Sequence, residues 1–224
     1  MRICWYGQST FSLASGGVTV FIDPFGAMDG ISSRGMRFAY PAIEDATADL
    51  LLVTHEHADH NAIEVVSGYR QLVRSTAGCF DTAIGQIVAI NSEHDAEAGT
   101  RRGPNTIFVF DLAGTRVCHF GDFGQSALRP EQRTAIGSVD LLLLPVGGGP
   151  TIGGAAAETI VRELQPKVVV PMHYRTEALN FLEPADDFLG RFADVRRLET
   201  SAFDLPDRAG TTGEATVLVP AVPL

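Results

Sequence analysis

An apolar segment that leads directly into a group of histidines constrains the fold of this chain more than any other feature. Residues Asp49–Thr54 read Asp-Leu-Leu-Leu-Val-Thr, a run typical of a strand buried on both faces. The next six residues, 55–60, read His-Glu-His-Ala-Asp-His and contain half of the chain's six histidines. A solvated loop with chance histidines is the alternative. This concentration directly after a buried strand favours ligands presented from a rigid element.

The chemistry of segment 55–60 indicates a metal site. Zinc accepts imidazole nitrogen and carboxylate oxygen at roughly 2.0–2.2 Å, usually with four ligands. One turn cannot wrap four ligands around a single ion, so the segment would divide them. His55 and His57 would face one ion, and Asp59 and His60 would face another. The sequence therefore predicts two divalent ions, zinc first, with manganese or iron as alternatives because these ligands suit all three.

The remaining pattern predicts a β-rich fold with few helices. Apolar or β-branched runs bounded by glycine and turn residues predict strands. These runs are Ile3–Tyr6, Ser9–Leu13, Val18–Ile22, Gln86–Ile90, Thr106–Asp111, Thr115–Phe120, Val139–Pro145, Val168–Met172 and Thr216–Val219. Apolar residues at helical spacing predict a helix over 155–164, which makes 139–172 a strand–helix–strand unit. A second helix is expected at Pro184–Phe192, and residues 26–42 are expected to form a loop that shapes a pocket.

The motif His-x-His-x-Asp-His after an apolar strand resembles the signature of the metallo-β-lactamase superfamily. The resemblance extends from the first strands to about Thr176. Residues 144–148 and Pro166–Tyr174 make the chain most similar to the short metal-dependent hydrolases that include the ascorbate-6-phosphate lactonase group. Gly149-Pro150 departs from that pattern, which has a bulkier residue before Thr151.

The resemblance implies roles for further residues. Asp23 would brace the metal-binding loop, and His94 would be the third histidine of the first metal site. Asp122, after Gly121, would bridge both ions, since a carboxylate has two oxygens. His173 would serve the second ion. Asp59 would bind that ion too, and would orient the attacking hydroxide and carry its proton.

The fold that the resemblance implies is an α+β, four-layer αβ/βα sandwich. Two mixed sheets would face each other, with helices outside and the site at one edge, in a single domain spanning 1–224. A hydroxide bridging two ions would attack a carbonyl carbon or a phosphorus. The expected activity is therefore hydrolysis of a small ester, lactone or related acyl or phosphoryl substrate.

Several neighbouring residues have two open interpretations. His119 is either a partner of a ligand carboxylate or a packed strand residue. Tyr174 and Arg175 could each donate to a developing oxyanion or serve the structure alone. Glu56 could orient a ligand imidazole, although the sequence does not show which one.

The amino-acid composition limits the classes of molecule that the chain is expected to bind. The chain has 17 Lys and Arg against 27 Asp and Glu, a net charge of -10, which makes nucleic acid an unlikely partner. Three cysteines without a CxxC pair fit a reducing cytoplasm. The sequence shows neither a signal-peptide pattern nor an apolar run of membrane length, so a cytoplasmic protein is expected.

Three other functions compete with hydrolysis of a small molecule. A nuclease or phosphodiesterase of the same fold would normally carry a cap domain or a basic surface. Di-iron redox relatives with a flavin partner have glutamate where this chain has His57. A non-catalytic metal-binding scaffold would be expected to have lost ligands, whereas every expected ligand is present. The sequence leaves the substrate, the metal and the oligomeric state open.

Overall fold

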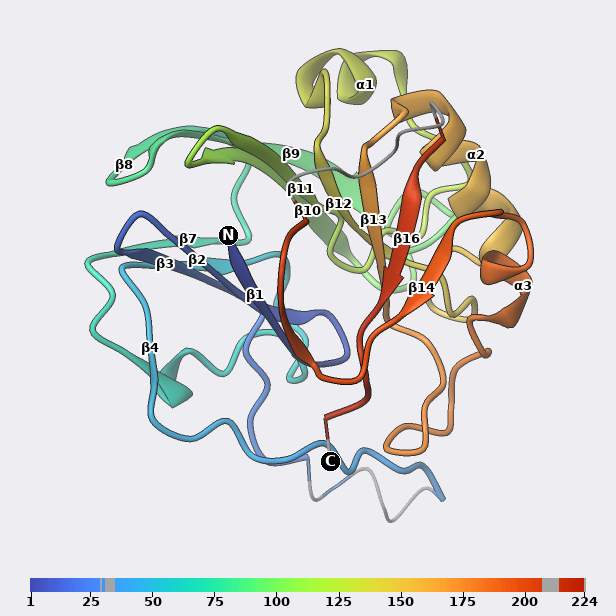
Figure 1. Ribbon diagram of the computed structural model, residues 1–224, viewed down its shortest axis with the longest axis horizontal. Coiled ribbons are helices and arrows are strands. Elements are labelled where there is room, and N and C mark those ends of the chain that lie inside the picture. Colours follow the sequence, from blue (N-terminus) through green and yellow to red (C-terminus); the bar gives the residue numbers. More distant parts are fainter. Residues whose placement is uncertain (29, 31–34, 207–213, 224) are drawn as a thin grey trace.

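Two mixed β-sheets lie face to face in the computed structural model, which describes residues 1–28, 30, 35–206 and 214–223 (Figure 1). In these residues one sheet has six strands in the order β15-β1-β2-β3-β5-β7. They are β15 (Ala202–Asp204), β1 (Arg2–Gly7), β2 (Thr10–Ser15), β3 (Val18–Ile22), β5 (Leu50–Val53) and β7 (Gln71–Arg74). The other has eight strands in the order β14-β16-β13-β12-β11-β10-β9-β8. They are β14 (Val195–Arg197), β16 (Thr216–Val219), β13 (Val168–Met172), β12 (Leu141–Pro145), β11 (Thr115–His119), β10 (Pro104–Leu112), β9 (Gly85–Glu93) and β8 (Gly78–Thr82).

Each sheet combines an antiparallel meander with parallel strands. β1, β2 and β3 pair antiparallel, after which β3, β5 and β7 run parallel. In the larger sheet β8 to β11 pair antiparallel, and β11, β12, β13 and β16 run parallel. A parallel pair needs a crossover, and helix α2 (Gly154–Leu164) supplies it between β12 and β13. Two short strands, β4 (Ala46–Thr47) and β6 (Val66–Ser67), form a separate parallel pair.

Strand β5 is buried on both faces, as its unbroken apolar run predicts. Leu50 and Leu52 are fully buried in the large apolar core that also includes side chains of the eight-stranded sheet. Leu51 points the other way and packs in a second apolar cluster with Phe25 and Leu179. Because both faces of this strand are packed, the loop that leaves its end has a rigid base.

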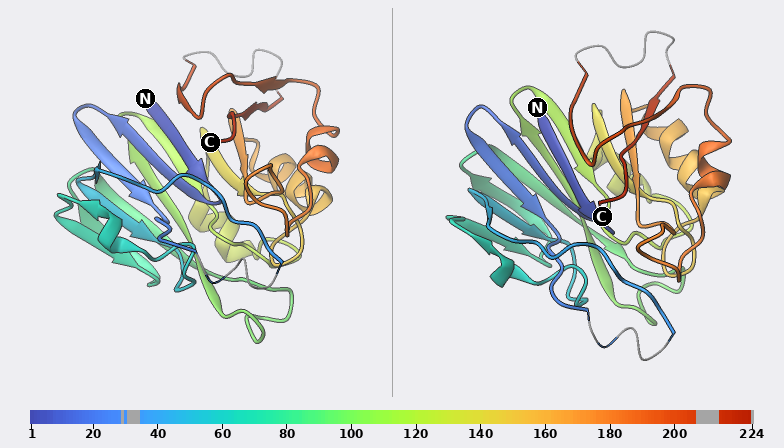
Figure 2. Two further views of the ribbon diagram at one scale, coloured as in Figure 1. Left: turned by 90° about the horizontal axis from the view of Figure 1, so that it is seen from below. Right: turned by 60° about the horizontal axis from the view of Figure 1, so that its bottom comes forward.

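The helices lie on the outer side of the eight-stranded sheet (Figure 2). They are α1 (Pro130–Ile136), α2 and α3 (Asp186–Leu189). Ala157 and Ile160 of α2 and Phe188 of α3 are buried in the large core. The outer face of the six-stranded sheet is covered by irregular segments and by a 3-10 helix, Ile63–Val65. The arrangement confirms the predicted α+β sandwich of two mixed sheets.

The predicted elements agree with the structure in the interior and differ at the edges. All the predicted strands are present within a few residues, and the helix over 155–164 is confirmed as α2. The helix expected at Pro184–Phe192 is shorter, because α3 ends where Gly190 follows. Strands β4, β6, β7, β8, β14 and β15 and helix α1 were not predicted. Within the expected loop 26–42, the described residues contain no helix and one isolated bridge, from Phe38 to Leu179; residues 29 and 31–34 lie outside the described residues.

Four strands of both sheets end beside the predicted ligands. His55 follows β5, His94 follows β9, Asp122 lies three residues after β11, and His173 follows β13. The described part of the chain contains no helix long and apolar enough to cross a membrane.

Candidate metal centre

Asp23 fixes the start and the end of the segment that carries four of the candidate ligands. Its carboxylate accepts hydrogen bonds from the Thr54 backbone N–H at 2.7 Å and from the Thr54 hydroxyl at 2.7 Å. The same carboxylate accepts one from His60 Nδ1 at 2.9 Å. Asp23 is fully buried. The structure therefore places Asp23 as the expected brace of this loop.

The first group of candidate ligands consists of His55, His57 and His94. His55 Nε2 lies 3.0 Å from His57 Nδ1. The ring centroids of His57 and His94 are 4.9 Å apart, and those of His55 and His94 are 4.8 Å apart. These residues come from two loops of different sheets, and the structure brings them together as the sequence predicts.

The second group consists of Asp59, His60 and His173. His60 Nε2 lies 3.6 Å from Asp59 Oδ2, and the rings of His60 and His173 have centroids 6.5 Å apart. His60 and His173 are buried, whereas the Asp59 side chain is 20% exposed. Asp59 is thus the member of this group that a substrate can reach most easily.

Asp122 lies between the two groups through a single oxygen. Its Oδ2 is 3.1 Å from His94 Nε2 and 3.9 Å from His55 Nε2 on one side. On the other side it is 3.0 Å from His173 Nε2 and 3.3 Å from His60 Nε2. Its Oδ1 accepts a hydrogen bond from a serine hydroxyl instead. Oδ2 is therefore the oxygen of Asp122 that would face cations held by these groups.

The spacing of these atoms fits metal ions. Two ligands of one tetrahedral zinc ion, each at about 2.05 Å, are about 3.3 Å apart. The separations of 3.0–3.3 Å between Asp122 Oδ2 and the Nε2 atoms of His94, His173 and His60 are close to that value. The buried His60 Nε2 has no hydrogen-bond partner among the described residues. An unpartnered buried nitrogen beside carboxylates fits the donor set of a cation site.

Hydrogen bonds at the far side of each ring direct the lone pairs inward. The Thr54 hydroxyl gives its proton to Asp23, so it accepts from His55 Nδ1 at 3.0 Å. His94 Nδ1 lies 3.0 Å from the Pro150 carbonyl oxygen, which only accepts. His60 Nδ1 faces Asp23 in the same way. These partners place the ring proton on Nδ1 and leave Nε2 free to bind a metal ion.

The charges of the centre favour a cation. Burial lowers the pKa of His55, and His60 lowers it further. Burial also lowers the pKa of His57, with a further contribution from His94. These rings are therefore neutral near pH 7, the form that binds metal. Burial raises the pKa of Asp122, but His173 and His60 outweigh it and hold that pKa well below its usual range, so the carboxylate is ionised.

The pKa of His60 shows most clearly that the carboxylates give the centre a negative electrostatic potential. Burial alone would lower its pKa, yet Asp122, Asp59 and Asp23 raise it well above its usual value. The surroundings thus stabilise a positive charge at a ring that is fully buried. A divalent ion at Nε2 would take the place of that proton.

The turn between β1 and β2 holds both carboxylates of the centre, and the sequence interpretation missed it. Gln8 Nε2 donates to Asp59 Oδ2 at 3.0 Å, and Ser9 Oγ donates to Asp122 Oδ1 at 3.1 Å. Both residues are buried. Gln8 has a φ of 50°, and its Oε1 is buried without a partner among the described residues. The available signal was Gly7, which marks a sharp turn that presents the next two side chains.

The structure assigns the open neighbours to supporting positions. His119 Nε2 donates to the Ser9 carbonyl at 2.9 Å, and its Nδ1 accepts from the Gly121 N–H at 3.1 Å. It therefore supports the loops before Asp122 without bonding to a ligand carboxylate. Tyr174 packs in the core and stacks on Trp5, with centroids 5.7 Å apart.

Two further candidates are held away from ligand rings. Arg175 is exposed, and its Nε donates to the Leu182 carbonyl at 2.6 Å. Glu56 forms a bidentate pair with Arg74, at 2.9 and 2.6 Å, and orients no imidazole. The oxyanion role considered for Tyr174 and Arg175, and the imidazole-orienting role considered for Glu56, are therefore not supported by their positions.

A cavity of about 700 Å³ opens beside the centre. Its lining includes His57, the loop that follows His94 and the segment Gly149–Thr151. This volume is in the range of small-molecule sites.

Comparison with known proteins agrees with this geometry. Residues 2–173 match the family described as the β-lactamase superfamily domain. A UPF0173 metal-dependent hydrolase of Methylobacterium nodulans is 32% identical over 206 residues, which cover 78% of this chain and 85% of the relative. One from Pelotomaculum thermopropionicum is 31% identical over 213 residues, covering 83% of this chain and 90% of the relative.

Solved structures extend the agreement to the whole chain. A Thermotoga maritima protein assigned to the Zn-dependent hydrolases of the metallo-β-lactamase superfamily superposes with a TM-score of 0.77 and 33% identity, over 98% of this chain and 97% of that one. An isothiocyanate hydrolase from Delia radicum gut bacteria, with a TM-score of 0.67 and 16% identity over 100% and 98% of the two chains, shares the fold. The chain therefore belongs to the metallo-β-lactamase superfamily and is one of its short metal-dependent hydrolases.

Proposed function

We propose that this hydrolase holds two divalent ions, zinc being the first expectation, and cleaves a small ester, lactone or related acyl or phosphoryl substrate. The observation that carries the proposal is the position of Asp122 Oδ2 between two ligand groups, at 3.1 Å from His94 and 3.0 Å from His173. The adjoining cavity of about 700 Å³ gives room for a small molecule.

The proposed ligand sets follow the two groups. His55, His57 and His94 would hold one ion, Asp59, His60 and His173 would hold the other, and Asp122 would contact both. When bound, such ions acidify a water molecule to a pKa near 7 and polarise a carbonyl or phosphoryl oxygen. The protein side chains supply the positions and the exclusion of bulk water, since all of these ligands except His57 and Asp59 are buried.

Asp59 is proposed to handle the proton. Its Oδ2 is held by Gln8, while Oδ1 has no hydrogen-bond partner among the described residues. Burial raises the pKa of Asp59, but His60 and His173 together outweigh it and lower that pKa. The carboxylate is therefore ionised and can accept a hydrogen bond from the attacking water at Oδ1. As the substrate bond breaks, the same oxygen can pass the proton to the leaving group.

Metal content and hydrolysis test the proposal together. Elemental analysis of the wild-type chain is expected to show about two transition-metal ions, and His57→Ala is expected to bind fewer. The metal-loaded wild type is then tested on esters, lactones and phosphodiesters. Glu64→Ala serves as control, because Glu64 is exposed on the 3-10 helix that follows the metal-binding loop and belongs to neither group.

Hydrolysis by the wild type and Glu64→Ala, with a loss of at least about a hundredfold in His57→Ala, would support the mechanism. Failure of the wild type to take up metal, or turnover that His57→Ala retains in full, would contradict it.

A further inference from the structure

Two of the segments that line the cavity beside the centre are joined to a candidate ligand. Pro150 in one segment accepts a hydrogen bond from His94 at 3.0 Å. Thr151 in the same segment lies 3.4 Å from His173 Nδ1. Another part of the lining comes from the loop 95–102, which begins directly after His94. A molecule in this cavity would therefore have one end at the candidate ions.

Loop 95–102, called here the Asp95 loop, is built around one carboxylate. Asp95 Oδ1 accepts the N–H groups of Glu97 and Gly99 at 2.9 and 2.8 Å. Asp95 Oδ2 accepts those of Arg101 and Arg102 at 3.0 and 2.8 Å. Four backbone donors therefore fix the Asp95 loop and saturate the charge of Asp95, so the arginines start from an ordered backbone.

Arg101 and Arg102 of this loop differ in whether an acidic side chain already pairs with them. Arg101 lies 3.7 Å from Glu97, a long pair between exposed side chains that is worth little. Arg102 is exposed and lines the cavity, and it bonds to the described residues through its backbone N–H, with no ion pair or side-chain hydrogen bond among them. A guanidinium without a partner presents donors that match a carboxylate or phosphate.

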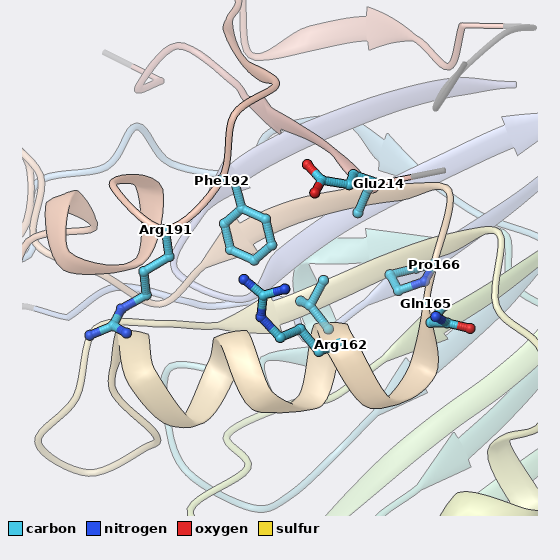
Figure 3. Close-up of a pocket in the computed structure, with 8 residues that line it drawn as sticks. Arg162, Gln165, Pro166, Arg191, Phe192 and Glu214 are labelled. Carbon is cyan, nitrogen blue, oxygen red and sulfur yellow. The ribbon is translucent and has the colours of Figure 1, made fainter. Parts of the chain in front are cut away.

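A second basic cavity on this protein shows the opposite arrangement. It has a volume of about 230 Å³ and is lined by Arg162 from α2 and Arg191 from the segment after α3 (Figure 3). Both guanidinium groups are already paired with Glu158, at 2.8 Å each, and Arg191 also pairs with Asp187 at 2.9 Å. The charges of both arginines in this second cavity are neutralised by carboxylates of the fold, so this cavity does not favour the binding of an anion.

We infer that the substrate carries an anionic group, a carboxylate or a phosphate, which Arg102 binds while the scissile bond lies at the metal centre; this rests on the proposed hydrolytic function. The chain has a net charge of -10, so an anionic substrate meets repulsion over most of the surface. The unpaired guanidinium of Arg102, in the cavity beside the centre, would attract the anionic group of such a substrate locally. Arg101, which also lines the cavity, adds a weaker attraction because it is paired with Glu97.

The test compares anions that have one charged end with anions that have two. Acetate can occupy the metal centre alone. Dicarboxylates from malonate to adipate, and phosphonoacetate, offer a second charged end for Arg102 over a range of lengths. Their dissociation constants are measured by calorimetry on the metal-loaded full chain, for the wild type, Arg102→Ala and Arg102→Lys. Arg2→Ala is the matched control, because Arg2 opens β1 and pairs with Asp204, outside the cavity lining.

We expect at least one two-ended anion to bind wild type about tenfold more tightly than acetate, the contribution of one charge-assisted hydrogen bond. This gain should be lost in Arg102→Ala, reduced in Arg102→Lys and kept in Arg2→Ala. A larger gain for phosphonoacetate than for the dicarboxylates identifies phosphate as the recognised group, and the reverse identifies carboxylate. Equal gains in wild type and Arg102→Ala, or no gain for any two-ended anion in wild type, overturn the inference.

The same variants separate this inference from the proposed function. Binding needs no turnover, so an Arg102-dependent gain in a protein that hydrolyses no substrate supports the anion site and contradicts the hydrolytic proposal. If esters are cleaved, the ratio of kcat/KM for 4-nitrophenyl hemisuccinate to that for 4-nitrophenyl acetate should fall about tenfold in Arg102→Ala, mainly through KM. An unchanged ratio would contradict the inference while leaving the hydrolytic activity established.

Discussion

Replacing Asp23 by asparagine should weaken metal binding without removing a ligand. Asp23 Oδ2 accepts hydrogen bonds from the Thr54 hydroxyl at 2.7 Å and from His60 Nδ1 at 2.9 Å. Asp23 Oδ1 accepts from the Thr54 N–H at 2.7 Å. If the asparagine oxygen keeps the bond to the backbone, its NH₂ group must face the two side chains. An NH₂ group can only donate, so both partners have to become acceptors.

For His60, becoming an acceptor at Nδ1 moves the ring proton to Nε2, the nitrogen that faces Asp122 at 3.3 Å. The Thr54 hydroxyl also loses its acceptor, and the nearest remaining one is His55 Nδ1 at 3.0 Å. Donation there moves the proton of His55 to its Nε2 as well. One nearly isosteric change thus opposes ligation in both groups. Loss of a carboxylate partner of a metal-bound histidine costs about 10- to 100-fold in affinity, or about 1.4–2.8 kcal/mol.

Zinc titration in competition with a chromophoric chelator measures this effect for each site, and imidazole nitrogen NMR reports which ring nitrogen carries the proton. Asp49→Asn is the control. Asp49 also accepts a backbone hydrogen bond, from the Thr19 N–H at 2.9 Å, but it lies at the other end of β5 from the candidate ligands. Asparagine tolerates the φ of 52° at position 23, so circular dichroism and the melting of the metal-free protein should change little. Wild-type affinity at both sites in Asp23→Asn would refute the reasoning.

Two further predictions concern the supports of the centre. The hydrogen bonds from Arg74 lower the pKa of Glu56 to about 2, so the pair stabilises the fold above the unfolded pKa of about 4.3 and loses this effect as the pH falls from there toward 2. Because the Glu56 side chain is 49% exposed, Glu56→Gln should cost under about 1 kcal/mol at pH 7 in the metal-free protein. The difference from wild type should shrink at pH 3 in denaturant unfolding, and a constant difference would argue against the ion pair. A Cβ on Gly147 would overlap the His173 carbonyl, so Gly147→Ala should destabilise the fold by about 1–3 kcal/mol in denaturant unfolding. Gly153→Ala should cost less, because a Cβ there would meet its nearest atom at 3.9 Å. Equal losses of stability in the two variants would contradict the packing argument.

The sequence predicts the buried strands well because their apolar runs depend on burial alone. β5, β12 and β13 are buried at every position, and each was predicted within a residue or two at either end. β7 and β8 carry few buried side chains and have no such run. They form because β5 and β9 offer edges to pair with, which is information that lies elsewhere in the chain.

The candidate ligands were readable for a similar reason. Histidine and aspartate at such tight spacing directly after a buried strand are the ligand types that zinc accepts, so segment 55–60 indicates a site by itself. Isolated His94, Asp122 and His173 required the family resemblance, because a single polar residue after a strand is common. The structure brings these ligands together from both sheets, at separations that no local pattern contains.

The turn between β1 and β2 explains what the sequence could not show. Gln8 and Ser9 lie between two strands of the six-stranded sheet. Ser9 nevertheless bonds to His119 of β11 and to Asp122 in the loop after it, and the Gln8 carbonyl accepts the N–H of His173 at 3.2 Å. The turn therefore ties the two sheets together where the two ligand groups meet. Since Gln8 also holds Asp59, the distance between the groups depends on how the sheets pack. Glutamine and serine are ordinary turn residues, so their role becomes visible only once both sheets are in place.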